Sequence, residues 1–182
     1  MIIISKYIDK LKDNHLFQKN TSDCGPYVIA MSLNAVHNNA FSGADISEVM
    51  NVPHWWFIFP VIMRIRSWAT FPWGITWYVR RQGLQSNWQI FATRKSLIEN
   101  ILKPLLQIVL VGGYSPLWAH YKILVAYDDV TDEFGFIDPG SRLSNIIWQK
   151  SSVFYDDWRH YGQLRVTIND PSAINGIQNV SM

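Results

Sequence analysis

The sequence predicts an α+β fold in which an N-terminal helical lobe packs on a C-terminal antiparallel sheet. Helix signals gather before residue 103, and most of the β-rich runs follow them, which is the order typical of this fold class. The runs lie near residues 106–111, 121–127, 134–138 and 162–168. Hydrophobic residues make up 48% of the 182 residues, enough to fill one core.

The helix that we expect to begin at Cys24 has the clearest signals. Pro26 suits a first helical turn, because the N–H that proline lacks would have no partner there. Residues 27–36 are mostly apolar, which is typical of a buried helix. Cys24 would then lie at a helix N-terminus, where the helix dipole and the unpaired N–H groups favour a negative charge.

The remaining elements are predicted from start and stop signals along the chain. Thr93 is a suitable N-cap for a helix that runs through Leu102, and Gln82-Gly83 would end a helix. Further helices are expected at residues 44–50, 60–69 and 73–81, and a further strand at residues 84–92. We expect a single domain over residues 1–182, with residues 169–182 as a loosely held tail that lacks aromatic side chains.

Two of the β-rich runs bring a histidine and an aspartate toward each other. His120 stands at the head of the run at 121–127, and Asp138 directly follows the run at 134–137. If these runs pair as a hairpin through the loop around residues 130–133, their far ends meet. We therefore expect His120 and Asp138 to be neighbours across the sheet, within reach of an imidazole–carboxylate hydrogen bond.

The chain has one cysteine, Cys24, which lies six residues after Gln18. A lone cysteine is usually a small buried hydrophobe, and a lone histidine is usually a hydrogen-bonded core group. Cysteine, histidine and aspartate in this order are, however, the parts of a thiol hydrolase. A thiolate attacks, an imidazole moves the proton, and a carboxylate orients the imidazole. The Gln18 amide and the helix N–H groups are suitable donors to an oxyanion.

These residues resemble those of the C39-like group of papain-fold cysteine peptidases, which includes the peptidase domains of bacteriocin exporters. The resemblance runs from about residue 15 to about residue 168 and rests on Gln18, Asp-Cys-Gly-Pro at 23–26, His120 and Asp-Pro-Gly at 138–140. The late Phe154 and Trp158 also fit that group. The resemblance implies a papain-like fold, with Gln18 in the oxyanion hole, Cys24 as nucleophile, His120 as general base and Asp138 as orienting residue.

Several functions remain open at this point. The first is a hydrolase, a peptidase or amidase, that cleaves a peptide or other amide substrate through a thioester on Cys24. An acyltransferase would use the same thioester with an amine as acceptor. A catalytically inactive binding module would keep the fold without the chemistry.

Tryptophan is concentrated in one part of the chain, a departure from the family pattern at residues 51–81. Seven of the nine tryptophans lie between Trp55 and Trp118, and five of these lie between Trp55 and Trp77. Indoles bury a large area and seek a partner for their N–H, so core or substrate-site wall is the first interpretation. The alternative is an exposed apolar patch for a hydrophobic ligand, a partner or a membrane surface.

Charge and cysteine content exclude several other classes of protein. The formal net charge is +2 and the basic residues are dispersed, which argues against a nucleic-acid interface. A single cysteine excludes an internal disulfide and a multi-cysteine zinc site, and we expect neither a metal nor a cofactor. The apolar run at residues 1–4 is too short for a signal peptide, and prolines and glycines interrupt the charge-free span at 104–121. We expect a cytoplasmic protein without a membrane-spanning segment.

Overall fold

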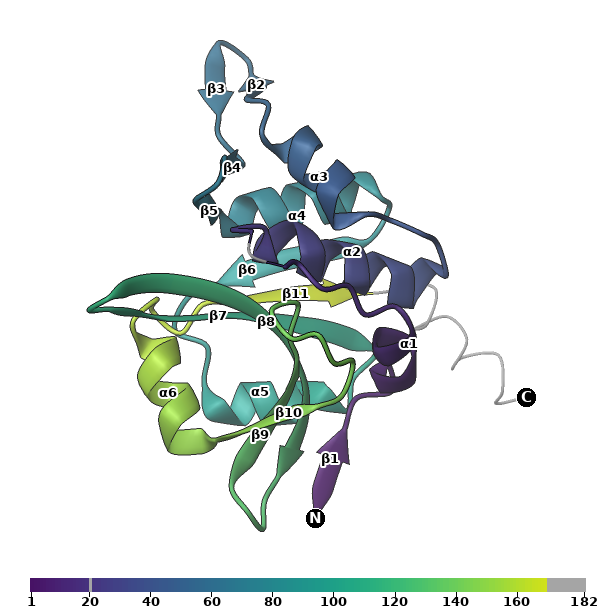
Figure 1. The fold of residues 1–182 in the computed structure, drawn as a ribbon, viewed down its shortest axis with the longest axis vertical. Helices are drawn as coiled ribbons and strands as arrows, with labels where there is room; N and C mark the ends of the chain where they lie inside the picture. The colour runs from purple at the N-terminus through teal and green to yellow at the C-terminus, as the bar shows by residue number, and fades with distance from the viewer. Residues whose placement is uncertain (20, 170–182) are drawn as a thin grey trace.

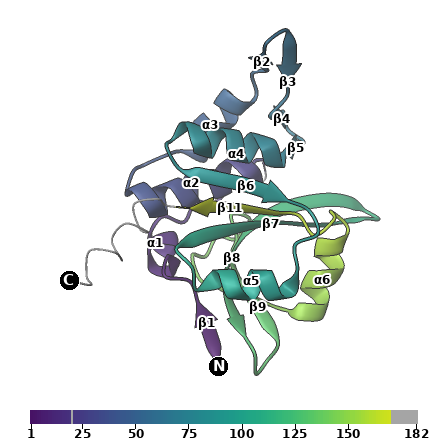
Figure 2. The same ribbon diagram turned by 180° about the vertical axis from the view of Figure 1, so that it is seen from behind.

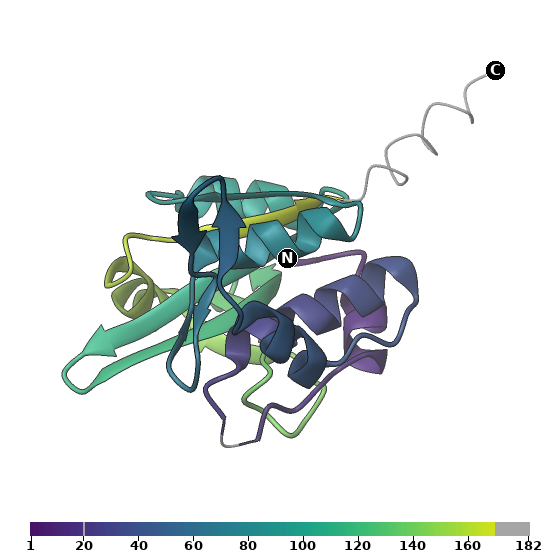
Figure 3. The same ribbon diagram turned by 90° about the horizontal axis from the view of Figure 1, so that it is seen from above.

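The computed structural model describes residues 1–19 and 21–169. Its main element is an antiparallel sheet of seven strands in the order β10-β9-β8-β7-β11-β6, with β1 paired to β8 (Figure 1). The strands are β1 Ile2–Ile4, β6 Gln85–Gln89, β7 Leu105–Tyr114, β8 Leu117–Asp128, β9 Glu133–Ile137, β10 Ile147–Lys150 and β11 Arg165–Asn169. The outer ends of β7 and β8 extend beyond the neighbouring strands (Figures 1 and 3).

Helices cover both faces of this sheet. Three of them form the helical lobe above one face, and α5 and α6 lie on the other face (Figures 1 and 2). The helices are α1 Ile8–Asp13, α2 Cys24–His37, α3 Gly43–Met50, α4 Pro72–Arg81, α5 Arg94–Ile101 and α6 Ser151–Arg159. The helical lobe consists of α2, α3 and α4, and α2 packs directly on β8. The predicted α+β arrangement of a helical lobe on an antiparallel sheet is confirmed.

Strand β7 shows how the two faces share the core. Ile108 and Leu110 belong to the cluster beneath the helical lobe, whereas Val109 and Val111 belong to the cluster beneath α5 and α6. Side chains alternate between the faces of a strand, so a strand that is covered on both faces needs apolar residues at every position. This requirement explains the unbroken apolar run in β7.

Several predicted elements are present close to their expected bounds, including α2, α4, α5 and the hairpin of β8 and β9. Thr93 caps α5 as expected. Its Oγ1 accepts from the Ser96 N–H at 3.2 Å, and the Ser96 hydroxyl accepts from the Thr93 N–H at 3.2 Å. The sequence analysis missed three elements, β1, β10 and α6, although Phe154 and Trp158 of α6 were singled out. The last strand ends at Asn169, and the rest of the expected tail lies outside the described residues.

The prediction of a helix at residues 60–69 is wrong. This part of the chain forms two small hairpins, β2 His54–Trp56 with β3 Phe59–Val61, and β4 Arg64–Ile65 with β5 Ala69–Thr70. Phe57 and Ser67 have positive φ values of 56° and 58°, which make the turns. The apolar side chains here are largely exposed, so a helix would have no buried face to stabilise it.

The tryptophan-rich region divides into a buried and an exposed part. Trp77 packs against the core beside the ring of His54, with the ring centroids 3.9 Å apart. The β2–β3 hairpin instead projects from the helical lobe (Figure 1), and Trp55, Phe57 and Ile58 are 71%, 89% and 77% exposed. At this hairpin the structure agrees with the alternative of an exposed apolar patch.

No helix in residues 1–19 and 21–169 is both long enough and apolar enough to cross a membrane.

Trp158 is expected to be a main source of stability on the α6 face of the sheet. It is fully buried, stacks on Phe154 and donates its indole N–H to the Leu164 carbonyl at 2.8 Å. Trp158→Ala should lower the free energy of unfolding in urea by about 3–5 kcal/mol, because a cavity forms and the carbonyl loses its donor. The control Trp148→Ala removes a half-exposed indole from β10 and should lower it by about 1 kcal/mol or less. Equal losses in the two variants would contradict this account of the core.

Candidate active site

Cys24 is the first residue of α2, as predicted, and its thiol is free. Gly25 explains how this helix end lies so close to β5. A Cβ atom at Gly25 would lie 2.5 Å from side-chain atoms of Thr70, closer than any real contact. Glycine therefore allows the backbone of α2 to approach β5, which brings the thiol to the edge of the helical lobe.

A buried arginine anchors the loop that leads into Cys24. The side chain of Arg64 is 1% exposed and pairs with the carboxylate of Asp23, the N-cap residue of α2. Its Nη1 donates to Ser47 Oγ at 2.8 Å and to Asn51 Oδ1 at 2.6 Å, and its Nη2 donates to the Ser22 carbonyl at 3.3 Å. Buried guanidinium groups require such partners. The sequence analysis missed this role, although a single arginine within the apolar residues 61–65 was an available signal.

His120, the fourth residue of β8, and Asp138, which directly follows β9, lie side by side, which confirms their predicted proximity. The pairing of Ile123 with Ile137 sets the register, and His120 Nε2 lies 2.5 Å from Asp138 Oδ1. The Gly140 N–H donates to the same carboxylate oxygen at 2.7 Å. A Cβ at Gly140 would lie 3.1 Å from that oxygen and 3.3 Å from the His120 ring, so a side chain here would press on the pair.

The N-terminal segment holds the loop after Asp138 in place. The Gln18 N–H donates to the Pro139 carbonyl at 2.8 Å, and His15 Nε2 lies 3.1 Å from the Asp138 carbonyl oxygen. These two bonds connect the residues before α2 to the end of β9. His15 was not predicted to take part, and no sequence signal distinguished it from the other histidines.

Charge interactions favour a protonated His120 beside an ionised Asp138. Burial alone would lower the pKa of His120, but hydrogen bonds to Asp138 and Cys24, together with their charges, raise it from 6.5 to about 9. Burial would likewise raise the pKa of Asp138, but the hydrogen bond and charge of His120, and then the charge of Lys122, hold it below its ordinary value. Lys122 Nζ lies 3.6 Å from Asp138 Oδ2. Lys122 was also missed, although residues two apart on a strand share a face.

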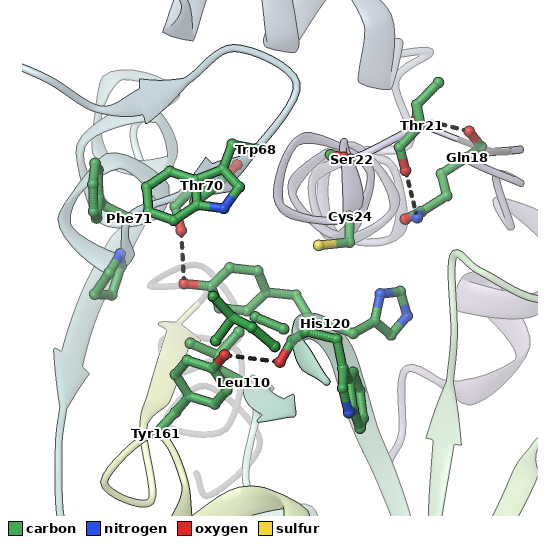
Figure 4. Close-up of a pocket in the computed structure, with 16 residues that line it drawn as sticks. Gln18, Thr21, Ser22, Cys24, Trp68, Thr70, Phe71, Leu110, His120 and Tyr161 are labelled. Carbon is green, nitrogen blue, oxygen red and sulfur yellow. Dashed lines mark hydrogen bonds between the residues drawn. The ribbon is translucent and has the colours of Figure 1, made fainter. Parts of the chain in front are cut away.

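The Cys24 thiol is the second group, after Asp138, that raises the pKa of the imidazole. Because Nε2 bonds to Asp138, Nδ1 is the nitrogen that is left for the sulfur. Figure 4 shows Cys24 and His120 at the same cavity, one from α2 and the other from β8. The structure thus brings together the thiol, the imidazole and the carboxylate that the sequence analysis had selected.

Gln18 lies on the same cavity, with its side chain directed by Thr21. Gln18 Nε2 donates to the Thr21 carbonyl at 3.0 Å, and the Thr21 hydroxyl donates back to the Gln18 carbonyl at 2.8 Å (Figure 4). An amide nitrogen carries two hydrogens, so the bond to Thr21 leaves one N–H of Gln18 for a ligand.

The cavity beside Cys24 has a volume of about 530 Å³ and is lined by residues of both the helical lobe and the sheet. Gln18, Cys24 and His120 line it directly, and Asp138 lies behind the imidazole. Cavities of this size hold ligands as large as a few amino-acid side chains. Within residues 1–19 and 21–169, no group of three or more histidine, cysteine or acidic side chains is placed to hold a metal ion.

The fold is that of C39-like peptidase domains. A protein from Bacillus anthracis classed as a C39-like peptidase superposes with a TM-score of 0.69 at 10% identity, over 93% of this chain and 98% of that one. The peptidase domain of Streptococcus ComA, a bi-functional ABC transporter of a quorum sensing pathway, gives 0.59 at 17% identity, over 85% and 96%. A double glycine motif protease from an AMS/PCAT transporter, in complex with a leader peptide, gives 0.56 at 12% identity, over 86% and 91%. The sequence matches no family model and no curated protein.

The raised pKa of His120 can be measured directly. The imidazole signal of His120 in an NMR titration should have its midpoint near pH 9, because Asp138 and Cys24 stabilise the charged ring. Asp138→Ala should move this midpoint below 9 toward the ordinary value of 6.5. The exposed His37, at the other end of α2, is the internal control and should not move.

The same shift predicts how stability depends on pH. A folded-state pKa above the unfolded value of 6.5 gives stabilisation that is complete below pH 6.5 and lost as pH rises through about 9. The unfolding free energy of the wild type should therefore fall over this range, and Asp138→Ala should flatten the dependence. A midpoint for His120 that is the same in both proteins would show that Asp138 does not control the imidazole.

Proposed function

We propose that this protein is a cysteine-dependent hydrolase, a peptidase or amidase that cleaves an amide bond through a thioester on Cys24. The observation that carries the proposal is the His120 imidazole, which lies 2.5 Å from the Asp138 carboxylate and lines the same cavity as the Cys24 thiol. The fold neighbours support it, because their names describe peptidases and proteases.

The proposed reaction begins from the Cys24 thiolate beside the protonated His120 imidazole. The thiolate attacks the amide carbonyl carbon, a C–S bond forms, and the carbonyl electrons move to oxygen. The free N–H of Gln18 and the backbone N–H groups at the start of α2 are the donors nearest to this oxyanion. His120 then gives its proton to the leaving nitrogen, and the C–N bond breaks to leave a thioester.

A water molecule completes the cycle. It attacks the thioester carbonyl while His120 accepts one of its protons, and the C–S bond breaks to release the acid and return the Cys24 thiolate beside the protonated imidazole. Asp138 keeps the ring oriented through both steps, and Lys122 helps to keep Asp138 ionised. An amine that entered in place of water would make the same thioester an acyl donor.

A peptide is the substrate class that the comparisons favour, because one fold neighbour is described in complex with a leader peptide. We also propose a hydrophobic partner for the exposed β2–β3 hairpin, since large exposed apolar patches commonly mark contact sites. A cytoplasmic location belongs to the proposal as well, and the free thiol of Cys24 is compatible with it.

The thiol–imidazole pair can be tested by alkylation. At pH 6, Cys24 should react with iodoacetamide much faster than a free thiol such as glutathione, because the charged His120 stabilises the thiolate. His120→Ala should remove this advantage, and the control His37→Ala should keep it. The rate is followed by mass spectrometry of the single modified cysteine. Equal rates for wild type and His120→Ala would refute the catalytic assignment of the pair.

Gln18 should affect turnover but not the reactivity of the thiol. Gln18→Ala removes one oxyanion donor and should reduce turnover on the order of 10²–10³-fold, about 2.7–4 kcal/mol in barrier, with Cys24 alkylation nearly unchanged. Asp138→Asn should do less damage than Asp138→Ala, because an amide oxygen still accepts from the imidazole. The control Gln85→Ala, on the exposed side of β6, should retain full turnover.

The turnover assay requires a substrate, which a peptide library screened for thioester trapping at Cys24 can supply. Full turnover in Gln18→Ala would mean that other groups form the oxyanion site, leaving Cys24, His120 and Asp138 as the proposed machinery. No thioester with any peptide, despite a reactive thiol, would favour the binding module.

A further inference from the structure

Two groups of apolar side chains line the cavity beside Cys24 as walls. One wall comes from the turn between β4 and β5 and from the start of α4, and the other comes from the β7–β8 hairpin. We call these side chains the apolar half of the cavity, and they are Trp68, Phe71, Pro72, Leu110, Leu117 and Trp118. Figure 4 shows Trp68 and Phe71 on one side of the open space, with Leu110 on another.

The apolar half contains no charge that could bind a charged ligand group. None of the 16 residues that line the cavity is an aspartate, glutamate, lysine or arginine. The charged His120 lies outside the apolar half. A charged group in the apolar half would lose its hydration without gaining a partner, so the walls select against it.

Several side chains of the apolar half are exposed to solvent, but the backbone that carries them is fixed by hydrogen bonds. Trp68, Leu117 and Trp118 are 63%, 64% and 41% exposed. Two tyrosine hydroxyls fix the backbone near these side chains, from the buried Tyr121 and the half-buried Tyr161. Tyr121 donates to the Thr70 carbonyl at 3.1 Å, and Tyr161 donates to the Trp118 carbonyl at 2.8 Å.

A glycine makes this arrangement possible on the sheet side. A Cβ at Gly112 would lie 2.1 Å from the Trp118 carbonyl oxygen and 2.4 Å from the Tyr161 ring. The Trp118 backbone and the Tyr161 ring can therefore both lie against this position only if it is a glycine. Because this backbone is already fixed, a ligand that covers the apolar side chains has little conformational entropy to offset, and more of the burial contributes to its affinity.

The Cys24 sulfur lies at the border between the two halves. In Figure 4 it points away from Gln18 and toward the space between Trp68 and Leu110. An amide carbonyl in contact with the sulfur and with the Gln18 N–H would place a neighbouring substituent in that space.

We propose that the apolar half of the cavity is a specificity subsite for a bulky uncharged apolar group next to the amide that is cleaved. This inference rests on the proposed role of Cys24. It adds a substrate class, amides with a large aliphatic or aromatic substituent adjacent to the scissile bond. Trp68 and Trp118 are the specificity-determining residues, since each wall carries one of these exposed indoles.

Alkylation with a graded set of reagents tests the subsite. Iodoacetamide, N-hexyliodoacetamide and iodoacetate all form the same C–S bond and release iodide, and they differ in the group that the cavity must accept. Each rate is divided by the rate of the same reagent with glutathione, so that intrinsic reactivity cancels. The N-hexyl reagent should be favoured over iodoacetamide on the order of tenfold or more, because each buried methylene contributes roughly fourfold. Iodoacetate reports on the charge of His120 instead, because the imidazolium attracts its carboxylate, and its rate should not depend on Trp68 or Trp118.

Substitutions at Trp68 and Trp118 test whether these side chains cause the preference for the N-hexyl reagent. In Trp68→Ala and Trp118→Ala the ratio of N-hexyl to parent reagent should fall several-fold toward one, and Trp148→Ala, a half-exposed indole on β10, should keep the wild-type ratio. Binding of N-hexylacetamide to Cys24→Ser, followed by tryptophan fluorescence, measures the same subsite without any chemistry. It should be saturable and weakened by Trp68→Ala.

The outcomes separate the subsite from the proposed function. A ratio near one, together with no saturable binding of N-hexylacetamide, would overturn the subsite even if the alkylation rate depends on His120. An unreactive Cys24 would instead overturn the proposed function, and the binding experiment would then decide on the cavity alone.

Discussion

The contact between the start of α2 and the sheet, where His120 of β8 meets Asp138 after β9, is the constraint on which the rest of the structure depends. The thiol belongs to the helical lobe, whereas the imidazole and the carboxylate belong to the sheet. The distances between the thiol, the imidazole and the carboxylate therefore depend on how precisely the helical lobe packs on the sheet. Gly25 permits that packing at Thr70, and Tyr121 of the sheet binds the carbonyl of the same threonine. Small rigid contacts of this kind suit a reaction in which atoms must be placed within fractions of an ångström.

Buried charges lie on both sides of this contact. Charged residues form only 16% of the chain, yet Arg64 and Asp23 are paired beneath Cys24, and Lys122 lies beside Asp138. Buried ion pairs are weak contributors to net stability, because desolvation offsets most of their attraction. Here these charged groups instead fix the position of a loop and the protonation state of a carboxylate. One pair holds the loop before the nucleophile, and the other keeps a carboxylate ionised next to an imidazole.

The sequence contained the central part of the site but not its surroundings. Cys24 could be placed at a helix start because Gly-Pro follows it, and His120 could be paired with Asp138 because hairpin pairing is a local property. The hairpins at residues 54–70 could not be predicted, since their apolar side chains are exposed and their turns use positive φ at Phe57 and Ser67. The roles of Arg64 and His15 depend on contacts between distant segments, which no local pattern encodes. The single-domain organisation and the catalytic roles themselves stay predictions.

The central claim is that His120 holds Cys24 as a thiolate in the resting protein. The ultraviolet absorbance of the thiolate tests it most directly, because the chain has one cysteine and the signal has one source. At pH 6, blocking Cys24 should remove close to one thiolate equivalent of absorbance per chain from the wild type and almost none from His120→Ala. No absorbance change in the wild type would show that the thiol is protonated at rest, and would contradict the account.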